Sequence, residues 1–153
     1  MSTLPTFGAV SAGVLVIGAG RAGPAPVLSW PRMASTALDK RAHGDAHTVW
    51  AAGGINASLG SLGGKDPWEL YATDMLDEGH FANDPTAVEM LYNRAPDRIR
   101  ELAEWDMAFD RTDDRKINQR YSGTQSFRRT CVVGGRTGQA LSDTSVSSVG
   151  TPK

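Results

Sequence analysis

Three glycines at regular spacing follow a short apolar run near the start of the chain. Gly18, Gly20 and Gly23 form the pattern G-x-G-x-x-G, directly after the run Val14–Ile17. In such a turn the first glycine permits the tight bend, the second lets the backbone approach a pyrophosphate, and the third allows a helix to pack closely on the strand. The position of the pattern favours a dinucleotide-binding loop, with an ordinary turn as the alternative.

An acidic residue stands where dinucleotide-binding domains commonly bind the ribose. Asp39 lies about 20 residues beyond the glycine pattern, at a place where a carboxylate accepts hydrogen bonds from ribose hydroxyls. A surface aspartate without a ligand is the alternative. The glycine turn by itself fits both FAD and NAD.

A second glycine-containing segment is more specific. Residues 47–57 read HTVWAAGGINA. This segment resembles the histidine-containing loop of succinate dehydrogenase and fumarate reductase flavoproteins, whose usual form is HTVAAxGGINA. In that family a lysine at the end of the second strand precedes the histidine by seven residues, as Lys40 precedes His47. The resemblance covers residues 14–23 and 38–144.

The resemblance implies that the cofactor is FAD and gives roles to particular positions. Gly18, Ala19, Gly20 and Gly23 match the pyrophosphate loop of the family. The positions that match the ribose-side segment and the loop along the isoalloxazine ring are Asp39, Lys40, His47, Thr48, Ala51, Ala52, Gly53, Gly54 and Ile55. Small residues are suited to this role because backbone amides can then approach a flat ring and tune its electronics.

His47 matches the histidine that carries covalent FAD in family members that oxidise succinate. L-aspartate oxidases resemble the same pattern but generally lack this histidine, so His47 favours the succinate/fumarate branch. Covalent attachment through His47 and non-covalent binding both stay open. An L-aspartate oxidase-type flavoprotein is kept as an alternative. His43 and His80 have weaker claims to a cofactor role.

The composition excludes several other classes of protein. The 153 residues carry a net charge of −1 and no basic run, so a nucleic-acid partner is not expected. Cys131 is the single cysteine, which excludes an internal disulfide and a multi-cysteine metal site and indicates a reducing compartment. We expect a cytoplasmic protein with no inserted membrane segment, peripheral at the inner face of the membrane if it joins a complex.

The pattern of apolar residues predicts the α/β class, as a partial Rossmann-like FAD-binding domain. We expect Val14–Ile17 to be a buried, central strand of a parallel sheet with flanking helices. Capping signals and helical spacing predict helices at about 67–78 and 85–104, with Pro96 kinking or restarting the second. Residues 109–121 are expected to be extended around a turn. The incomplete domain is assigned to residues 1–141, followed by a disordered tail at 142–153.

The helix signals depend on particular residues. Asp66 and Asp84 are the expected N-caps of the two helices, and Gly79 is expected to end the first. Trp68, Tyr71 and Trp105 stand at helical spacing and are expected to be core residues rather than cofactor contacts. Three arginines, Arg128, Arg129 and Arg136, fit either a dicarboxylate site or structural ion pairs.

The chain departs from the family at its first crossover. Pro24, Pro26 and Pro31 occupy the stretch where a dinucleotide fold has a helix, so we expect an irregular connection there and weak phosphate binding. The codons that encode residues 29–36, when translated from the third base of each codon, permit a sequence typical of the helix end and turn of a dinucleotide fold. A compensated frameshift is therefore a hypothesis for this segment.

Three interpretations of function follow. The first is the FAD-binding N-terminal part of a succinate dehydrogenase/fumarate reductase-type oxidoreductase, without the substrate and catalytic region. The second is a non-functional remnant, frameshifted or truncated, without a stable cofactor. The third is a module that assembles with a separately encoded second half. No catalytic residue and no metal ligand is assigned, and an iron–sulfur partner is implied only for the intact enzyme. Whether this chain is an enzyme stays open, although we expect it to be inactive alone.

Overall fold

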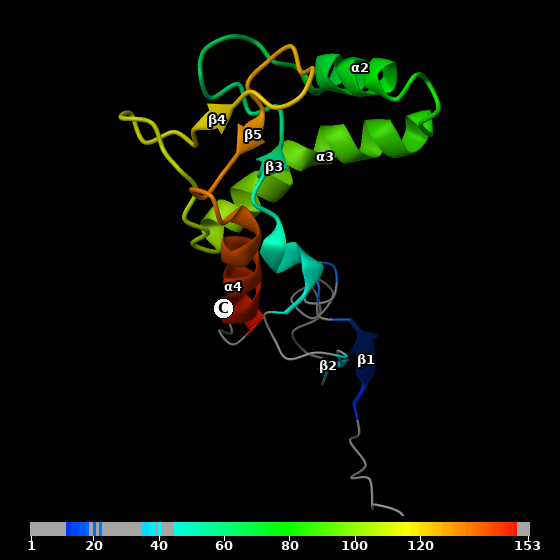
Figure 1. Cartoon of the computed structure of the whole chain (residues 1–153), viewed down its shortest axis with the longest axis vertical. Coiled ribbons are helices and arrows are strands. Elements are labelled where there is room, and N and C mark those ends of the chain that lie inside the picture. The colour runs from blue at the N-terminus through cyan, green and yellow to red at the C-terminus, as the bar shows by residue number, and fades with distance from the viewer. Residues whose placement is uncertain are drawn as a thin grey trace, which may run out of the picture.

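The computed structural model describes residues 12–18, 20, 22, 35–38, 40 and 45–149. Two small sheets and three α-helices lie along one elongated body, with the β1–β2 sheet at one end and helices α2 and α3 at the other (Figure 1). The elements in chain order are β1 (Val14–Ile17), β2 (Ser35–Leu38), the 3₁₀ helix η1 (His47–Trp50), β3 (Ile55–Asn56), α2 (Trp68–Glu78), α3 (Pro85–Glu104), β4 (Gln119–Arg120), β5 (Thr130–Cys131) and α4 (Thr137–Val149).

Strands β1 and β2 form the expected parallel pair. Val14 pairs with Ser35 and Ile17 with Leu38, and the amide of Gly18 donates to the Leu38 carbonyl at 2.7 Å. The expectation of a buried, central strand is wrong for the described residues, in which β1 pairs with β2 alone and Ile17 is 85% exposed. Parallel strands are buried when other elements cover both faces of their sheet. In the described part of the chain, no element covers the face of β1 that carries Ile17.

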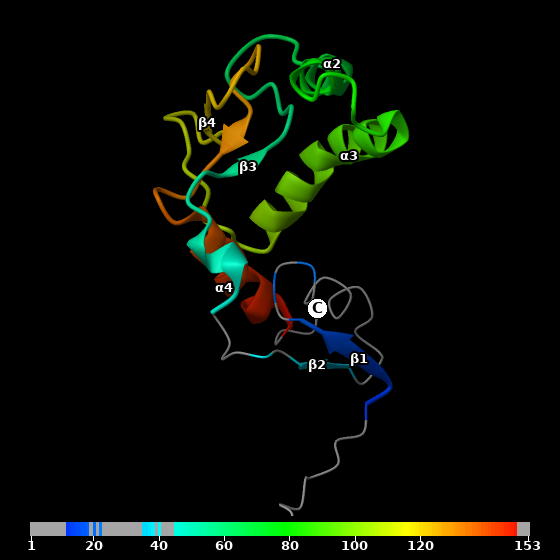
Figure 2. The ribbon, with the colours of Figure 1, turned by 45° about the vertical axis from the view of Figure 1, so that its right-hand side comes forward.

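The second sheet is antiparallel and has the order β3-β5-β4. Ile55 pairs with Cys131, which pairs in turn with Gln119. A bridge between Arg111 and Ile117 confirms the extended hairpin expected before β4. Helices α2 and α3 lie beside this antiparallel sheet rather than on the β1–β2 pair (Figures 1 and 2). The prediction that helices flank the parallel sheet is therefore wrong for these two helices.

Both predicted long helices are confirmed, with one correction at the start of α2. Asp84 caps α3, because its carboxylate accepts hydrogen bonds from the amides of Thr86 and Ala87. Gly79 ends α2 as expected. Asp66, however, is not the cap of α2, because its carboxylate binds Arg129 instead. Helix α3 continues through Pro96 without a restart.

The tail expected to be disordered from residue 142 is helical as far as Val149. Two features stabilise this helix despite its many hydroxyl side chains. Leu141 is buried in the core, and the buried Ser145 hydroxyl donates to the Leu141 carbonyl at 2.7 Å. Serine satisfies its own hydroxyl in this way within a helix, so a Ser-rich composition did not prevent helix formation. Residues 150–153 lie outside the described residues.

The hydrophobic core lies between β3, β5, the second half of α3 and the start of α4. Trp105 packs against this core, as its spacing predicts, and Tyr71 is buried beside α3. The buried members of the core are Ala57, Ile99, Leu102, Met107, Phe109, Cys131, Val133 and Leu141. The charged residues of α3 face solvent, where Arg98 pairs with Glu101.

Candidate functional site

The glycine turn leaves the carboxyl end of β1, at the edge where parallel strands commonly bind ligands. Gly18 has φ +109°, a conformation that favours glycine. Gly20 lies close to the η1 segment, because a methyl group added there would come 3.9 Å from the Thr48 hydroxyl oxygen. The structure therefore brings the two sequence motifs together. Ala19 and Gly23 of the predicted site lie outside the described residues.

Residues of the ribose-side segment are only partly described. Lys40 is exposed just beyond the end of β2. Strand β2 ends at Leu38, whose carbonyl accepts a hydrogen bond from the Gly18 amide. Asp39 lies outside the described residues. The proline-rich crossover at residues 24–34 also lies outside them, so its expected irregular path and the frameshift hypothesis stay predictions.

The histidine motif forms the single turn η1. The amide of Val49 donates to the Ala46 carbonyl at 3.0 Å, and the amide of Ala51 donates to the Thr48 carbonyl at 3.1 Å. His47 is exposed to solvent. The exposed segment Ala51–Gly54 continues directly from this turn. This row of alanines and glycines presents no bulky side chain to a flat ligand.

Helix α4 holds η1 in place through Gly138. The Gly138 amide donates to the Ala51 carbonyl at 2.7 Å. A Cβ at Gly138 would collide with the Thr48 carbonyl oxygen and lie 2.8 Å from the Ala51 carbonyl oxygen. Glycine is thus required for this close approach of helix and loop (Figure 2). The sequence pattern around residue 138 carried no signal for this packing role.

The two adjacent glycines of the loop have different surroundings. A Cβ at Gly53 would meet open space. Gly54 has φ +124°, and a Cβ there would lie 2.6 Å from Thr130 Cγ2 and 2.7 Å from the Cys131 carbonyl oxygen. Gly54 therefore packs the loop against β5. Ile55 belongs to β3, where it pairs with Cys131 of β5, and its side chain packs against the core, so it anchors the end of the loop.

The described residues fit a dinucleotide cofactor of the flavin type. The positive-φ glycine turn offers backbone to a pyrophosphate, and the adjacent open loop offers backbone to a flat ring. Gly20 and Thr48 bring these two regions close together, with room for little more than a methyl group between them. One elongated ligand can therefore reach both.

A buried ion cluster around Arg129 lies apart from this site, and the sequence did not identify its two carboxylate partners. The Arg129 side chain is 0% exposed and pairs with Asp66 at 2.8 Å and with Asp74 at 2.6 Å. Its guanidinium also lies 4.3 Å from the centre of the Tyr71 ring. Of the two alternatives for this arginine, the structure favours a structural ion pair. The partners stand 55 and 63 positions away, so no local spacing reveals them.

Burial and hydrogen bonds shift several ionisable groups near β5. Burial alone would raise the pKa of the Asp74 carboxyl, but hydrogen bonds from Arg129 and Ser126 outweigh it and hold that pKa below its ordinary value. Burial raises the pKa of the Cys131 thiol to about 12 and that of the Tyr71 hydroxyl to about 12. The thiol is therefore protonated and unsuited to act as a nucleophile.

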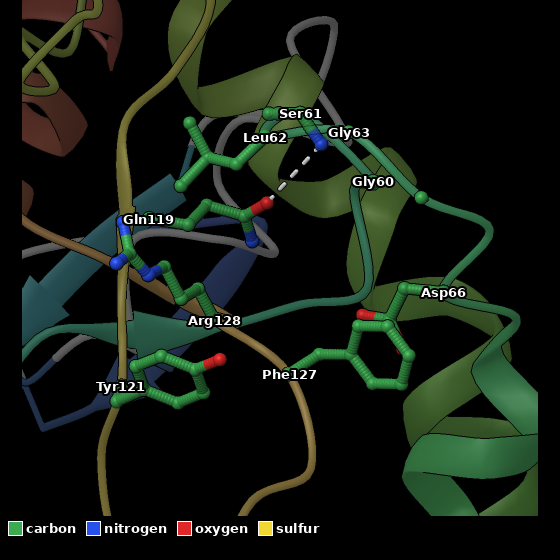
Figure 3. A pocket seen from close by; sticks show the side chains of 10 residues that line it. Gly60, Ser61, Leu62, Gly63, Asp66, Gln119, Tyr121, Phe127 and Arg128 are labelled. Carbon is green, nitrogen blue, oxygen red and sulfur yellow. Dashed lines mark hydrogen bonds between the residues drawn. The ribbon is translucent and has the colours of Figure 1, made fainter.

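A hollow beside β4 contains none of the predicted cofactor residues. Gly60, Leu62 and Gly63 form one wall, and Tyr121 and Arg128 lie on the other (Figure 3). The Ser61 amide donates a hydrogen bond to the side-chain oxygen of Gln119 across the hollow. The hollow is thus built by the loop before α2 and is separate from the glycine turn.

Two further kinds of feature are absent from the described residues. None of their helices has the length and apolar character needed to cross a membrane. No group of three or more His, Cys, Asp or Glu side chains among them is arranged to hold a metal ion.

Comparison with known proteins identifies the class. The sequence model of a protein family described as an FAD binding domain matches residues 13–151. The chain therefore belongs to this family of FAD-binding flavoproteins. Within it, the chain belongs to the succinate dehydrogenase and fumarate reductase flavoproteins, of which it matches the N-terminal, FAD-binding part.

The relatives show how much of a flavoprotein the chain represents. It is 35% identical over 134 residues to one subunit of the fumarate reductase (CoM/CoB) of Methanothermobacter marburgensis, covering 84% of this chain and 24% of that protein. It is 33% identical over 138 residues to the succinate dehydrogenase flavoprotein subunit of Rickettsia felis, covering 84% and 23%. The chain spans about a quarter of the length of these relatives.

A solved structure supports the same assignment. The Mycobacterium smegmatis Sdh1 complex in the apo form contains a chain that is similar to this one with a TM-score of 0.84 and 36% identity. The similarity covers 90% of this chain and 23% of that chain. The mixed α/β arrangement with a small parallel sheet matches the N-terminal part of that flavoprotein.

Proposed function

We propose that this chain forms the FAD-binding part of a succinate dehydrogenase/fumarate reductase-type oxidoreductase. The observation that carries the proposal is the proximity of the glycine turn to η1, since a Cβ added at Gly20 would lie 3.9 Å from the Thr48 hydroxyl oxygen. The FAD binding domain family supports the cofactor. The chemistry that FAD supplies when bound is two-electron transfer at its isoalloxazine ring.

Each part of the site has its own role in this proposal. Gly18, whose amide donates to the Leu38 carbonyl, makes the turn, so that the backbone amides of Ala19, Gly20 and Gly23 can hold the pyrophosphate; Lys40 and Asp39 belong to the ribose side. The exposed loop from His47 through Thr48, Ala51, Ala52 and Gly53 lies along the isoalloxazine ring, whereas Gly54 and Ile55 anchor that loop to β5. Helix α4 packs against this loop through Gly138, whose amide donates to the Ala51 carbonyl.

His47 is the proposed point of covalent attachment. Its imidazole is exposed at the start of η1, so a flavin that lies along the loop can reach it. Reconstituted protein is denatured and passed over a desalting column. If flavin stays with the denatured wild-type chain but is lost from a His47→Ser variant, the result supports covalent attachment through His47. If flavin is lost from both proteins, the binding is non-covalent.

Dicarboxylate turnover is proposed only for the longer proteins of the family. The 153 residues correspond to about a quarter of the relatives, and no catalytic acid–base residue of the family is assigned to a position here. Loss of such a residue alone costs orders of magnitude in rate. In the longer protein we propose a partner that carries iron–sulfur clusters and a place at the inner face of the membrane.

A second candidate is a chain that holds FAD only with a complementing polypeptide, or does not hold it at all. The exposed side chains of Leu15, Ile17 and Leu38 on the β1–β2 pair favour it. A yellow protein with flavin absorbance after gel filtration supports FAD binding by the chain. A colourless product that a protease degrades rapidly supports the second candidate.

The activity test uses dye-coupled succinate oxidation by flavin-loaded chain beside the His47→Ser variant. We expect no dicarboxylate-specific turnover, because the described residues do not enclose a substrate against a flavin. Appreciable succinate-specific turnover that the His47→Ser substitution abolishes would contradict this part of the proposal.

A further inference from the structure

Trp50 presents a large aromatic surface to solvent within the cofactor loop. Its residue surface is 77% exposed, at the last position of η1. Tryptophan is highly buried on average in folded proteins. Trp68 and Trp105 follow that rule, since both are half-buried. The exposed indole at position 50 therefore needs a reason in its surroundings.

The geometry of η1 places this indole beside His47. A 3₁₀ helix has three residues per turn, so side chains at i and i+3 lie on the same face. His47 and Trp50 stand at this spacing and both are exposed. Thr48 and Val49, between them, are half-buried, and Thr48 lies toward Gly20.

The surface around Trp50 is rigid and open. Gly138 of α4 abuts the backbone of Thr48 and Ala51, which fixes the turn. Beyond the indole, the exposed row Ala51–Gly53 has no bulky side chain to obstruct a flat ligand. An aromatic side chain on a fixed support, next to a flat and open backbone, is suited to stacking on a ring system.

We propose that Trp50 stacks on the isoalloxazine ring of FAD, with His47 at the edge of the same ring. This inference rests on the proposed function and adds a positioning residue to it. The loop of related flavoproteins usually has alanine at this place, so the indole would give this chain a contact that the usual loop lacks. The indole is electron-rich and the oxidised isoalloxazine is electron-poor, which favours a stacked pair.

Flavin fluorescence gives a readout that does not depend on turnover. An indole stacked on a flavin quenches its emission by electron transfer in the excited state, whereas phenyl and methyl groups do not. The full 153-residue chain is titrated with FAD, and the dissociation constant and the emission of the bound flavin are measured. The variants are Trp50→Ala, Trp50→Phe and, as the matched control, Trp68→Phe in α2. Circular dichroism verifies folding, which an exposed side chain such as Trp50 does not determine.

We expect FAD to bind the wild-type chain with strongly quenched emission. Trp50→Ala should weaken binding about tenfold and raise the emission of bound flavin several-fold. Trp50→Phe should keep the affinity within about threefold while losing the quenching, and Trp68→Phe should match wild type. Normal FAD binding with quenching retained in Trp50→Ala would overturn this inference and leave the proposed function intact. Failure of wild-type chain to bind FAD would overturn both.

Discussion

At the scale of single residues, Arg129 shows how a side chain that resembles a ligand-binding group has a structural task. It is fully enclosed and pairs with Asp66, which precedes α2, and with Asp74, which lies within α2. The guanidinium fork matches two carboxylates at once. This cluster ties the strand β5 to the helix that precedes α3.

Replacing Arg129 should therefore lower stability severely. Arg129→Met leaves two largely buried carboxylates without a cation, which typically costs about 3–5 kcal/mol. Denaturant unfolding measures the loss. The matched control is Arg128→Met, whose exposed guanidinium lies over Tyr121, and we expect a loss below about 1 kcal/mol. Equal losses in the two variants would show that the buried cluster has no special role.

The Asp74 carboxyl makes the stability of this cluster dependent on pH. Its pKa is lowered in the folded chain, so the ionised form stabilises the fold above the ordinary pKa of aspartate. That stability is lost as the pH falls below about 4 and through the folded pKa. The urea midpoint of Asp74→Asn should accordingly decline less on acidification than that of wild type. Asp77→Asn, an exposed position on the same helix, should parallel wild type, and a flattened profile in both variants would contradict the assignment.

At the scale of elements, close backbone contacts decide where the cofactor loop lies. Gly54 sets it against β5, and Gly138 sets it against α4. Both contacts exclude a Cβ atom. The loop is thus held from two sides while Ala51–Gly53 stays open.

The two neighbouring glycines of the loop give a matched pair for testing this. Gly54→Ala forces a side chain into a positive φ and against Thr130 and Cys131, so we expect a loss of about 3 kcal/mol or more. Gly53→Ala meets open space and should change stability by less than about 0.5 kcal/mol. Thermal unfolding compares the two. A tolerated Gly54→Ala would show that the loop does not pack on β5 as described.

The elements that local signals specify were predictable, and those specified by distant partners were not. The spacing of apolar residues and the cap at Asp84 predict α3 well, because a helix is built from contacts three and four residues apart. Asp66 has the same local signal but binds Arg129, 63 positions away. Most of helix α4 was not predicted, because a Ser/Thr-rich sequence is typical of a disordered tail. The burial of Leu141 and Ser145 depends on the packing of α4 against the rest of the fold, which local composition does not reveal.

The candidate site was predictable for a different reason. The glycine pattern and the histidine loop each have a recognisable sequence, and the structure places Gly20 beside Thr48. Their surroundings were not predictable, because the contact of Gly138 with Ala51 joins positions 87 residues apart (138 minus 51). Such a contact depends on the path of the whole chain between them.

At the scale of the whole molecule, the described residues form a packed body and a small exposed sheet. The core around β3, β5 and α3 buries its apolar side chains, whereas the β1–β2 sheet exposes Leu15, Ile17 and Leu38. The candidate FAD site lies where η1 and α4 stand between this sheet and the packed body (Figure 2). Binding of FAD at this junction would stabilise the β1–β2 sheet by mass action.

The central claim is that this site binds FAD, and parallel titrations of the purified chain with FAD and NAD test it most directly. Gly53→Val is measured beside wild type, because its side chain projects from the open loop without a packing partner. We predict that FAD binds more tightly than NAD, and that Gly53→Val weakens FAD binding several-fold while its unfolding temperature stays unchanged. Tighter binding of NAD, or FAD binding that is indifferent to Gly53→Val, would contradict the account.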